Sequence, residues 1–109
     1  HAYQAAKTLK HLERKWFSDP ATDCKKAKRL GRVVTMQPGW DGIKLSVMKQ
    51  INYQKYSNHA YLKEMLLGTG DSYLEETNTW GDTYWGVCNG SGQNNLGKLL
   101  MEIRSDLRV

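Results

Sequence analysis

Residues 80–97 hold side chains that could bind or react with a ligand. This segment is rich in glycine, asparagine and aromatic residues, and its only carboxylate is Asp82. Trp80, Tyr84 and Trp85 provide flat apolar surface with polar tips, which suits a ring or a sugar. Glycine is favoured where the backbone needs positive φ or where a ligand must come close. The composition therefore indicates either a ligand-binding loop or a capped surface loop before a packing helix.

A helix is expected directly after this loop, from about Asn95 to Leu107. Apolar residues recur through it at helical spacing, at Leu96, Leu99, Leu100, Ile103 and Leu107. A glycine-rich loop that leads into a helix presents free backbone N–H groups and the positive end of the helix dipole, which together suit an anion. This junction is therefore a second candidate feature of a binding site.

A reactive amine could come from the beginning of the chain. Apolar residues follow helical spacing from Ala2 to Trp16, which predicts one amphipathic helix over residues 2–16. Lys7 lies at the edge of its apolar stripe. A lysine at such an edge usually extends its ammonium group to water. In a closed pocket, desolvation would instead lower the pKa of Lys7 and make its amine nucleophilic.

The next segment combines a helix with the strongest positive cluster of the chain. Ser18-Asp19-Pro20 is a helix-start signal in which Asp19 caps the helix. We expect the helix to end at Gly31 and its inward face to consist of Cys24, Ala27 and Leu30. Five basic residues follow within residues 25–32: Lys25, Lys26, Lys28, Arg29 and Arg32. Such a run is either a solvated face or a steering surface for a phosphorylated ligand.

The remaining elements must position these residues. Helices are expected from Trp40 to about Tyr56, and from a cap at Ser57 or Asn58 to Gly68. Residues 73–77 and 84–88 are expected to pair as short strands across the 78–82 loop. The predicted fold class is α+β and predominantly helical, with about five helices around a small core and a short two-stranded β element.

The length and charge of the chain narrow its class. With 109 residues we expect a single domain, residues 1–109, that is long enough to bury a modest core. The net charge of +5 and the pI near 9.3 are compatible with phosphate-bearing partners, and equally with solubility alone. No apolar run in the sequence is long enough to span a bilayer, so we expect no membrane partner.

Cysteine and histidine spacing argues against a metal site. Cys24 and Cys88 form no CxxC pair, and the three histidines are scattered without ligand spacing. We therefore expect free thiols in a reducing compartment, a cytoplasmic location, and no metal or other cofactor. His1 is an unusual first residue, which suggests that a leader or an N-terminal segment has been removed.

Taken together, these motifs resemble one known family. Asp82-Thr83-Tyr84-Trp85-Gly86 followed by residues 92–104 is similar to the closing motif of the NADAR, or YbiA-like, family: an aspartate, two variable residues, Trp-Gly, then Gly-x-Asn-x-Leu-Gly and a Leu-Leu-Met-Glu helix. Four earlier blocks also resemble the family: residues 1–7, residues 27–32, Trp40-Asp41 with Lys44 and Met48, and residues 66–71 with Leu74 and Glu76. The resemblance covers nearly the whole chain in order.

The resemblance implies a YbiA-like fold, with one departure from the family pattern. In the family a glutamate precedes the first-helix histidine, and an N-terminal Phe/Asn-rich segment precedes that glutamate. Because the chain begins at His1, we expect it to lack this segment. The departure bears on catalysis, since that glutamate is one of the family's catalytic residues.

The resemblance also implies an N-glycosidase that hydrolyses the N-glycosidic bond of a nucleotide-like substrate. The implied substrates are ADP-ribosylated guanine, as a small molecule or in a nucleic acid, and phosphorylated intermediates of riboflavin synthesis. In the family pattern, Lys7 attacks C1′ of the sugar to form a Schiff base, and Asp82 stabilises the positive charge that develops on the ribose. The substrate-binding residues implied by the match are Trp40, Trp85, Gly86, Asn94, Tyr3, Gln4, Lys28 and Arg32.

Two alternatives remain open for the same residues. Without the N-terminal glutamate, the fold could keep a nucleotide or ADP-ribose pocket as a binding module that does not turn over. The 25–32 face could instead belong to a basic nucleic-acid-binding domain, although the aromatic residues lack the strand arrangement of base-stacking platforms. Tyr3, Gln4 and Glu76 could equally have structural roles.

Overall fold

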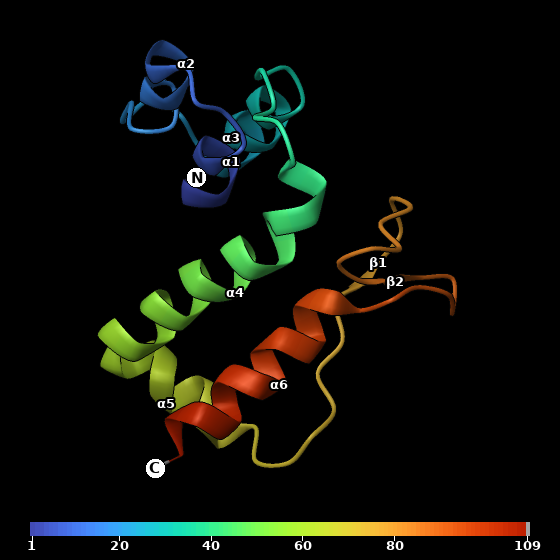
Figure 1. Cartoon of the computed structure of the whole chain (residues 1–109). Coiled ribbons are helices and arrows are strands. Elements are labelled where there is room, and N and C mark those ends of the chain that lie inside the picture. The colour runs from blue at the N-terminus through green and yellow to red at the C-terminus, as the bar shows by residue number, and fades with distance from the viewer. Residues whose placement is uncertain (109) are drawn as a thin grey trace. The chain divides into compact units, whose positions relative to one another are not determined.

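The computed structural model describes residues 1–108, which divide into two compact units (Figure 1). The first unit is His1–Val47 and the second begins at Met48. Within the described residues there are six α-helices and one sheet of two short strands, in the order α1, α2, α3, α4, α5, β1, β2, α6. The predicted fold class, α+β and predominantly helical, is therefore confirmed.

The first unit contains three short helices: α1 (Ala2–Ala6), α2 (His11–Lys15) and α3 (Cys24–Gly31). Its core is small, with Phe17, Ala27 and Val34 buried and with Ala5 and Leu30 packed against them. The long helix α4 (Trp40–Asn58) begins in this unit and continues into the second, as Figure 1 shows. The expected helix from Trp40 is thus confirmed, and it extends two residues beyond Tyr56.

The prediction of one helix over residues 2–16 is wrong, because the chain breaks between α1 and α2. Thr8 is fully buried, and its hydroxyl accepts the N–H of Lys10 and donates to Glu13. Such side-chain bonds compete with helical backbone bonds. The carbonyl oxygens that end α1 accept instead from Gln37, whose side chain binds Ala6 O and whose backbone N–H binds Lys7 O, both at 2.6 Å.

The break also changes which side chains are buried. Leu9 and Leu12 belonged to the predicted apolar stripe, yet they are 66% and 73% exposed. Trp16, at the end of the same stripe, is 38% exposed, whereas the adjacent Phe17 enters the core. The apolar pattern of residues 9–16 therefore does not mark a core-facing helix surface in this structure.

The predicted start of α3 is also wrong. Asp23, rather than Asp19, caps the helix, and its carboxylate accepts the N–H of Lys26 at 2.7 Å. Asp19 instead forms a local turn, with its side chain accepting from Ala21 N–H and its carbonyl from Thr22 N–H. Because the helix begins later, Cys24 lies on its exposed first turn and does not face inward. Ala27 is buried and the helix ends at Gly31, as expected.

The second unit is built around α6 (Asn95–Leu107), whose bounds match the prediction. Its core consists of Leu66 from α5 (Ala60–Gly68) and Leu99, Ile103 and Leu107 from α6. Seven partly buried side chains pack against these four: Met48, Tyr56, Leu67, Leu74, Trp85, Leu96 and Leu100. Burial of this apolar surface helps to position the loop before α6, because Trp85 belongs both to that loop and to the packing around the core.

The predicted cap of α5 is not formed by Ser57 or Asn58, since α4 continues through both residues. The Ser57 hydroxyl donates back to the Tyr53 carbonyl of its own helix, and His59 takes the cap position without a side-chain hydrogen bond. The predicted end of α5 at Gly68 is confirmed.

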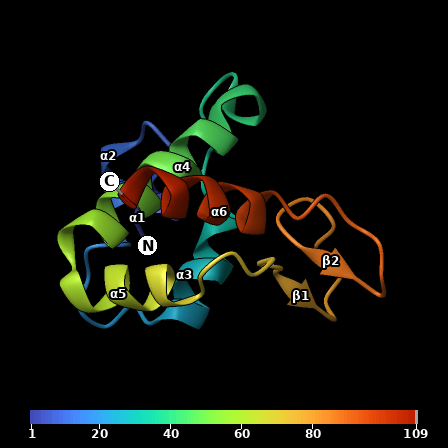
Figure 2. The same cartoon turned by 90° about the horizontal axis from the view of Figure 1, so that it is seen from below.

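The β element is smaller than predicted, and its two strands run parallel to each other. Strand β1 (Thr77–Asn78) and strand β2 (Val87–Cys88) lie side by side in Figure 2 and pair in parallel, Thr77 with Val87 and Asn78 with Cys88. A hairpin across residues 78–82 would have been antiparallel. Strand β1 includes Asn78, the first residue of the expected loop, and the chain continues to Val87 before it pairs in parallel.

Two further features concern the whole described chain. None of the helices formed by residues 1–108 has both the length and the apolar character needed to cross a bilayer. Cys24 and Cys88 are both free thiols, and they belong to different units.

We expect Gly97→Ala to destabilise the protein, although alanine is normally the better helix former. A Cβ at Gly97 in α6 would overlap the Leu74 carbonyl and the Asn94 side chain. Overpacking of this kind costs about 1–3 kcal/mol. In the matched variant Gly42→Ala, the added Cβ in α4 meets nothing within 4 Å, so this variant should be stabilised by up to about 1 kcal/mol. Urea unfolding of both variants tests the contrast, and equal stability of the two would contradict the close approach at Gly97.

Candidate functional site

Lys7 follows directly after α1 and is half-buried. Its Nζ donates to the Gly31 carbonyl at 3.2 Å and lies 5.6 Å from the centroid of the Tyr3 ring. A cation at this distance from a tyrosine ring is attracted by the negative face of the ring. Lys7 therefore does not extend freely into water but is held between α1 and the end of α3.

The pKa of Lys7 is lowered from the ordinary lysine value of 10.5. Burial is the largest cause, because it disfavours the charged ammonium, and the positive charges of Arg32 and Lys44 act in the same direction. A lowered pKa increases the fraction of neutral amine at a given pH, and only the neutral amine is a nucleophile. Of the two alternatives that the sequence left open for Lys7, the lowered pKa agrees with partial desolvation and not with full extension into water.

Tyr3 and Trp40 complete an aromatic cluster around this amine. Their ring centroids are 5.4 Å apart with an interplanar angle of 52°. Trp40, the first residue of α4, is only 4% exposed. The structure thus brings Lys7, Tyr3 and Trp40 together within the first unit, whereas stacking of a ligand on Trp40 stays a prediction.

The other predicted site residues of the first unit surround the end of α3. The Gln4 side chain lies against Gly31, and its Oε1 is buried without a hydrogen-bond partner among residues 1–108. Arg32 caps α3 and is exposed, and its charge reaches Lys7. Lys28 is an exposed residue of α3. Of the predicted basic residues, Arg32 is the one that acts electrostatically on Lys7.

Asp82 belongs to the second unit, in the turn between β1 and β2. Its Oδ1 accepts the backbone N–H groups of Tyr84 at 3.2 Å and Trp85 at 2.9 Å. Two backbone N–H groups that bind one carboxylate oxygen fix the orientation of the carboxylate. Its Oδ2 has no hydrogen-bond partner within the described part of the chain.

Trp85 and Gly86 follow Asp82 on the same loop. The rings of Tyr84 and Trp85 meet edge to face, with centroids 4.8 Å apart and planes at 89°, and Trp85 also packs on the core of the second unit. Gly86 is buried, and a Cβ there would overlap the Glu76 carbonyl. The predicted residues Asp82, Trp85 and Gly86 therefore form one continuous, tightly held segment.

Asn94 is 1% exposed and takes a left-handed conformation, with φ of 54°. Its side-chain amide accepts the N–H of Glu76 and donates to the Leu74 carbonyl and the Tyr73 hydroxyl, at 2.8–3.1 Å. These bonds occupy its oxygen and both amide hydrogens. The observed role of Asn94 is to hold the 73–76 segment, while direct contact with a ligand stays a prediction.

Of the two alternatives for the loop before α6, the structure favours a capped loop over an anion site. The N–H groups of Asn95 and Leu96 are not free, because they donate to the carbonyl oxygens of Tyr84 and Trp85 at 3.2 and 3.0 Å. Gln93 N–H likewise binds Thr83 O at 2.8 Å. The neighbouring loop thus takes up the N–H groups of residues 93, 95 and 96, which an anion at this helix start would otherwise use.

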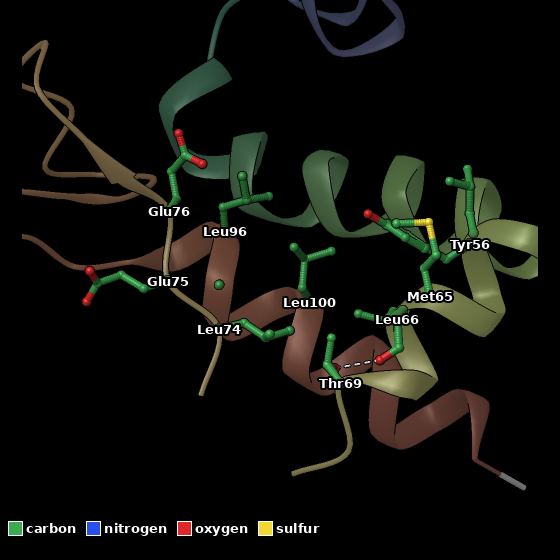
Figure 3. A pocket seen from close by; sticks show the side chains of 11 residues that line it. Tyr56, Met65, Leu66, Thr69, Leu74, Glu75, Glu76, Leu96 and Leu100 are labelled. Atoms are coloured by element: carbon green, nitrogen blue, oxygen red, sulfur yellow. Dashed lines mark hydrogen bonds between the residues drawn. The ribbon is translucent and has the colours of Figure 1, made fainter. Parts of the chain in front are cut away.

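A cavity of about 300 Å³ lies elsewhere in the second unit, between α5, residues 74–76 and α6 (Figure 3). Its wall is largely apolar, and in Figure 3 the carboxylate of Glu75 points away from the apolar side chains. None of the predicted site residues is among its described lining residues. No sequence pattern indicated this cavity, because most of its lining residues are ordinary helix-packing residues.

Asn78 was not predicted as a site residue and was expected only as part of the 78–82 loop. Asn78 is 4% exposed, and both ends of its side-chain amide bind the backbone of Asp82. A polar residue spaced four positions before the only carboxylate of the loop was the available signal.

The comparisons with known proteins identify the family. The NADAR domain profile matches residues 1–108, and the chain belongs to this family. Over 115 residues the chain is 36% identical to N-glycosidase YbiA of Escherichia coli, a match that covers all of this chain and 69% of YbiA. The NMR structure of E. coli YbiA has the same fold, with a TM-score of 0.86 and 34% identity over 98% of this chain and 64% of that one.

Two further relatives extend the comparison. N-glycosidase Npun_R5314 of Nostoc punctiforme is 41% identical over 85 residues, which are 75% of this chain and 54% of that protein. Riboflavin biosynthesis protein VVA0006 of Vibrio vulnificus is 35% identical over 91 residues, which are 81% of this chain and 24% of that protein. The chain thus spans about half the length of the Nostoc relative and about two thirds of YbiA.

We expect Arg32→Gln to raise the pKa of Lys7, because it removes a positive charge that disfavours the ammonium form. The pKa should remain below 10.5, since burial, the larger cause, is unchanged. The pH dependence of Lys7 acetylation, followed by mass spectrometry of the modified peptide, measures the shift. Lys25→Gln removes the same charge from α3 and should leave Lys7 unaffected. An equal effect of both variants would show that Arg32 has no special proximity to the amine.

Proposed function

We propose that this protein hydrolyses the N-glycosidic bond of a nucleotide-like substrate. The observation that carries the proposal is the half-buried Lys7 amine, with its lowered pKa, against Tyr3 and Trp40. A lysine in this condition suits attack on the masked aldehyde carbon of a sugar. Family membership supports the same reaction class, since two of the relatives are named N-glycosidases.

The proposed substrate carries a ribosyl group and phosphate. One candidate is ADP-ribosylated guanine, and the other is a phosphorylated intermediate of riboflavin synthesis, a choice supported by the name of the Vibrio relative. Residues 1–47 contain ten basic residues (lysine and arginine) and four acidic residues. Residues 48–109 contain six basic residues and seven acidic residues. The unit with the reactive amine is therefore the basic one, which favours an anionic ligand near Lys28 and Arg32.

The proposed reaction divides the chemistry between the amine and the carboxylate. The neutral Lys7 amine forms a bond to C1′ while the C1′–N bond to the base breaks. The electron pair of the broken bond leaves with the base nitrogen, which takes up the proton that the bonded amine loses. Opening of the ribose ring then gives the Schiff base, and water hydrolyses it to the free sugar and the lysine amine. Positive charge develops on the ribose during bond cleavage, and the Asp82 carboxylate stabilises it.

The remaining residues are proposed to bind and orient the substrate. Gln4 Oε1, buried without a partner among residues 1–108, suits a hydroxyl or amine donor of the ligand. Trp85 supplies an aromatic surface next to the carboxylate, and Gly86 and Asn94 hold that loop in place. The free thiols of Cys24 and Cys88 favour a reducing compartment, which agrees with the proposed cytoplasmic location.

Lys7→Ala should abolish release of the base, and Asp82→Asn should lower kcat by about a hundredfold or more, as loss of transition-state charge stabilisation does. The assay follows release of free ADP-ribose from an ADP-ribosylated guanine oligonucleotide and, separately, of the amine from a phosphorylated ribosylaminopyrimidine. Borohydride added during turnover should trap a sugar adduct on Lys7.

The same experiment separates hydrolysis from simple binding. Thermal stabilisation by ADP-ribose without any release of product would support a binding module and contradict the proposed reaction. Full activity of Lys7→Ala, together with no trapped adduct, would remove the Schiff base while leaving hydrolysis by a carboxylate in place.

We expect Lys28→Gln to raise KM several-fold for a phosphorylated substrate and to leave kcat nearly unchanged, because a phosphate contact binds ground state and transition state alike. Lys63→Gln, which removes a positive charge from α5 in the other unit, is the matched control. Steady-state kinetics with the phosphorylated and the dephosphorylated substrate measure the effect. A KM change that is the same for both substrates would contradict the phosphate contact.

A further inference from the structure

Asn78 holds both backbone groups of Asp82. Its Oδ1 accepts the Asp82 N–H at 3.0 Å and its Nδ2 donates to the Asp82 carbonyl at 2.8 Å. The Asn78 amide thus bonds both the N–H and the carbonyl of Asp82, as the backbone of a neighbouring strand does for a residue in a sheet. Since Asn78 is 4% exposed, water competes little for these two bonds.

Asn78 is itself fixed by its surroundings. It is the last residue of β1 and pairs with Cys88 of β2. Its Nδ2 lies against Gly86, where an added Cβ would come within 2.8 Å. The absence of a side chain at residue 86 therefore leaves room for the Asn78 amide, which gives Gly86 a defined role beside the carboxylate.

The bonds continue from the Asp82 backbone to its carboxylate. Asn78 fixes the backbone of Asp82, and the N–H groups of Tyr84 and Trp85 fix Oδ1 of its side chain. A carboxylate held at its backbone and at one oxygen has few ways to turn. A fixed orientation raises the rate that a catalytic group can support, because a misplacement of about 1 Å can lower the rate a hundredfold.

We infer that Asn78 is the positioning residue that holds the Asp82 carboxylate for bond cleavage. This inference rests on the proposed function, in which Asp82 stabilises charge on the ribose. The side-chain amide of Asn78 suits this role because it supplies one acceptor and one donor to a single residue. An aspartate at this position could accept from Asp82 N–H but could not donate to the Asp82 carbonyl, and it would place a second negative charge beside the first.

The decisive experiment compares Asn78→Ala and Asn78→Asp with Asn58→Asp, the same charge change at the exposed end of α4. Both Asn78 variants should lose about tenfold to a hundredfold in kcat, with KM changed less than about twofold, because substrate binding does not use Asn78. Asn58→Asp should behave as wild type.

A measurement that needs no turnover separates the positioning role of Asn78 from the proposed hydrolysis. Amide hydrogen exchange at Asp82, Tyr84 and Trp85 should speed up in Asn78→Ala while exchange in the core of α6 stays as in wild type. If Asp82→Asn removes activity but both Asn78 variants keep wild-type kcat, the positioning role is wrong and the proposed function stands. If the wild type releases no product, the proposed function fails. In that case, unchanged exchange at residues 82–85 overturns the inference as well, and faster exchange supports it.

Discussion

The loop that carries Asp82 depends on one buried amide, the side chain of Asn94. This amide joins the 73–76 segment to the first turn of α6, while the carbonyl oxygens of residues 83–86 take up the N–H groups of residues 93–96. A buried amide left without partners costs about 1–3 kcal/mol, so the arrangement is stable only when all of these bonds form together. The left-handed φ of 54° at Asn94 lets one residue both end the loop and start the helix.

Much of the second unit follows from local patterns in the sequence. Leu96, Leu99, Ile103 and Leu107 define a helical stripe whose every member is buried or packed in the core, so the bounds of α6 were predictable. The same holds for α4 from Trp40, since its apolar residues extend over several turns. For the site, the neighbourhood of Asp82, Trp85 and Gly86 was predictable because these residues are close together in the chain. The half-burial of Lys7 was not predictable, because a lysine at the edge of an apolar stripe usually extends its ammonium group to water.

The failures have a common physical origin in hydrogen bonds that the local sequence pattern does not reveal. The break after Lys7 depends on Gln37, some thirty residues later, which binds the last carbonyl groups of α1. The loss of the anion site depends on the carbonyl oxygens of Tyr84 and Trp85, which no helix-start signal reveals. Asp19 and Asp23 are equally good capping residues by type, and the choice between them was decided by the turn that Asp19 forms with Ala21.

The parallel pairing of β1 and β2 makes the spacing of the loop between them critical. Both strands are only two residues long, so the backbone between them is not supported by a long ladder, and the Asn78 side chain takes over that task at Asp82. An inserted residue between positions 78 and 82 would separate the amide from the backbone groups it spans. The exposed turn at Asn89 and Gly90 lies beyond this link, and lengthening there leaves the carboxylate in register. Among relatives of different length, the interval 78–82 should therefore be invariant while the 89–90 turn varies.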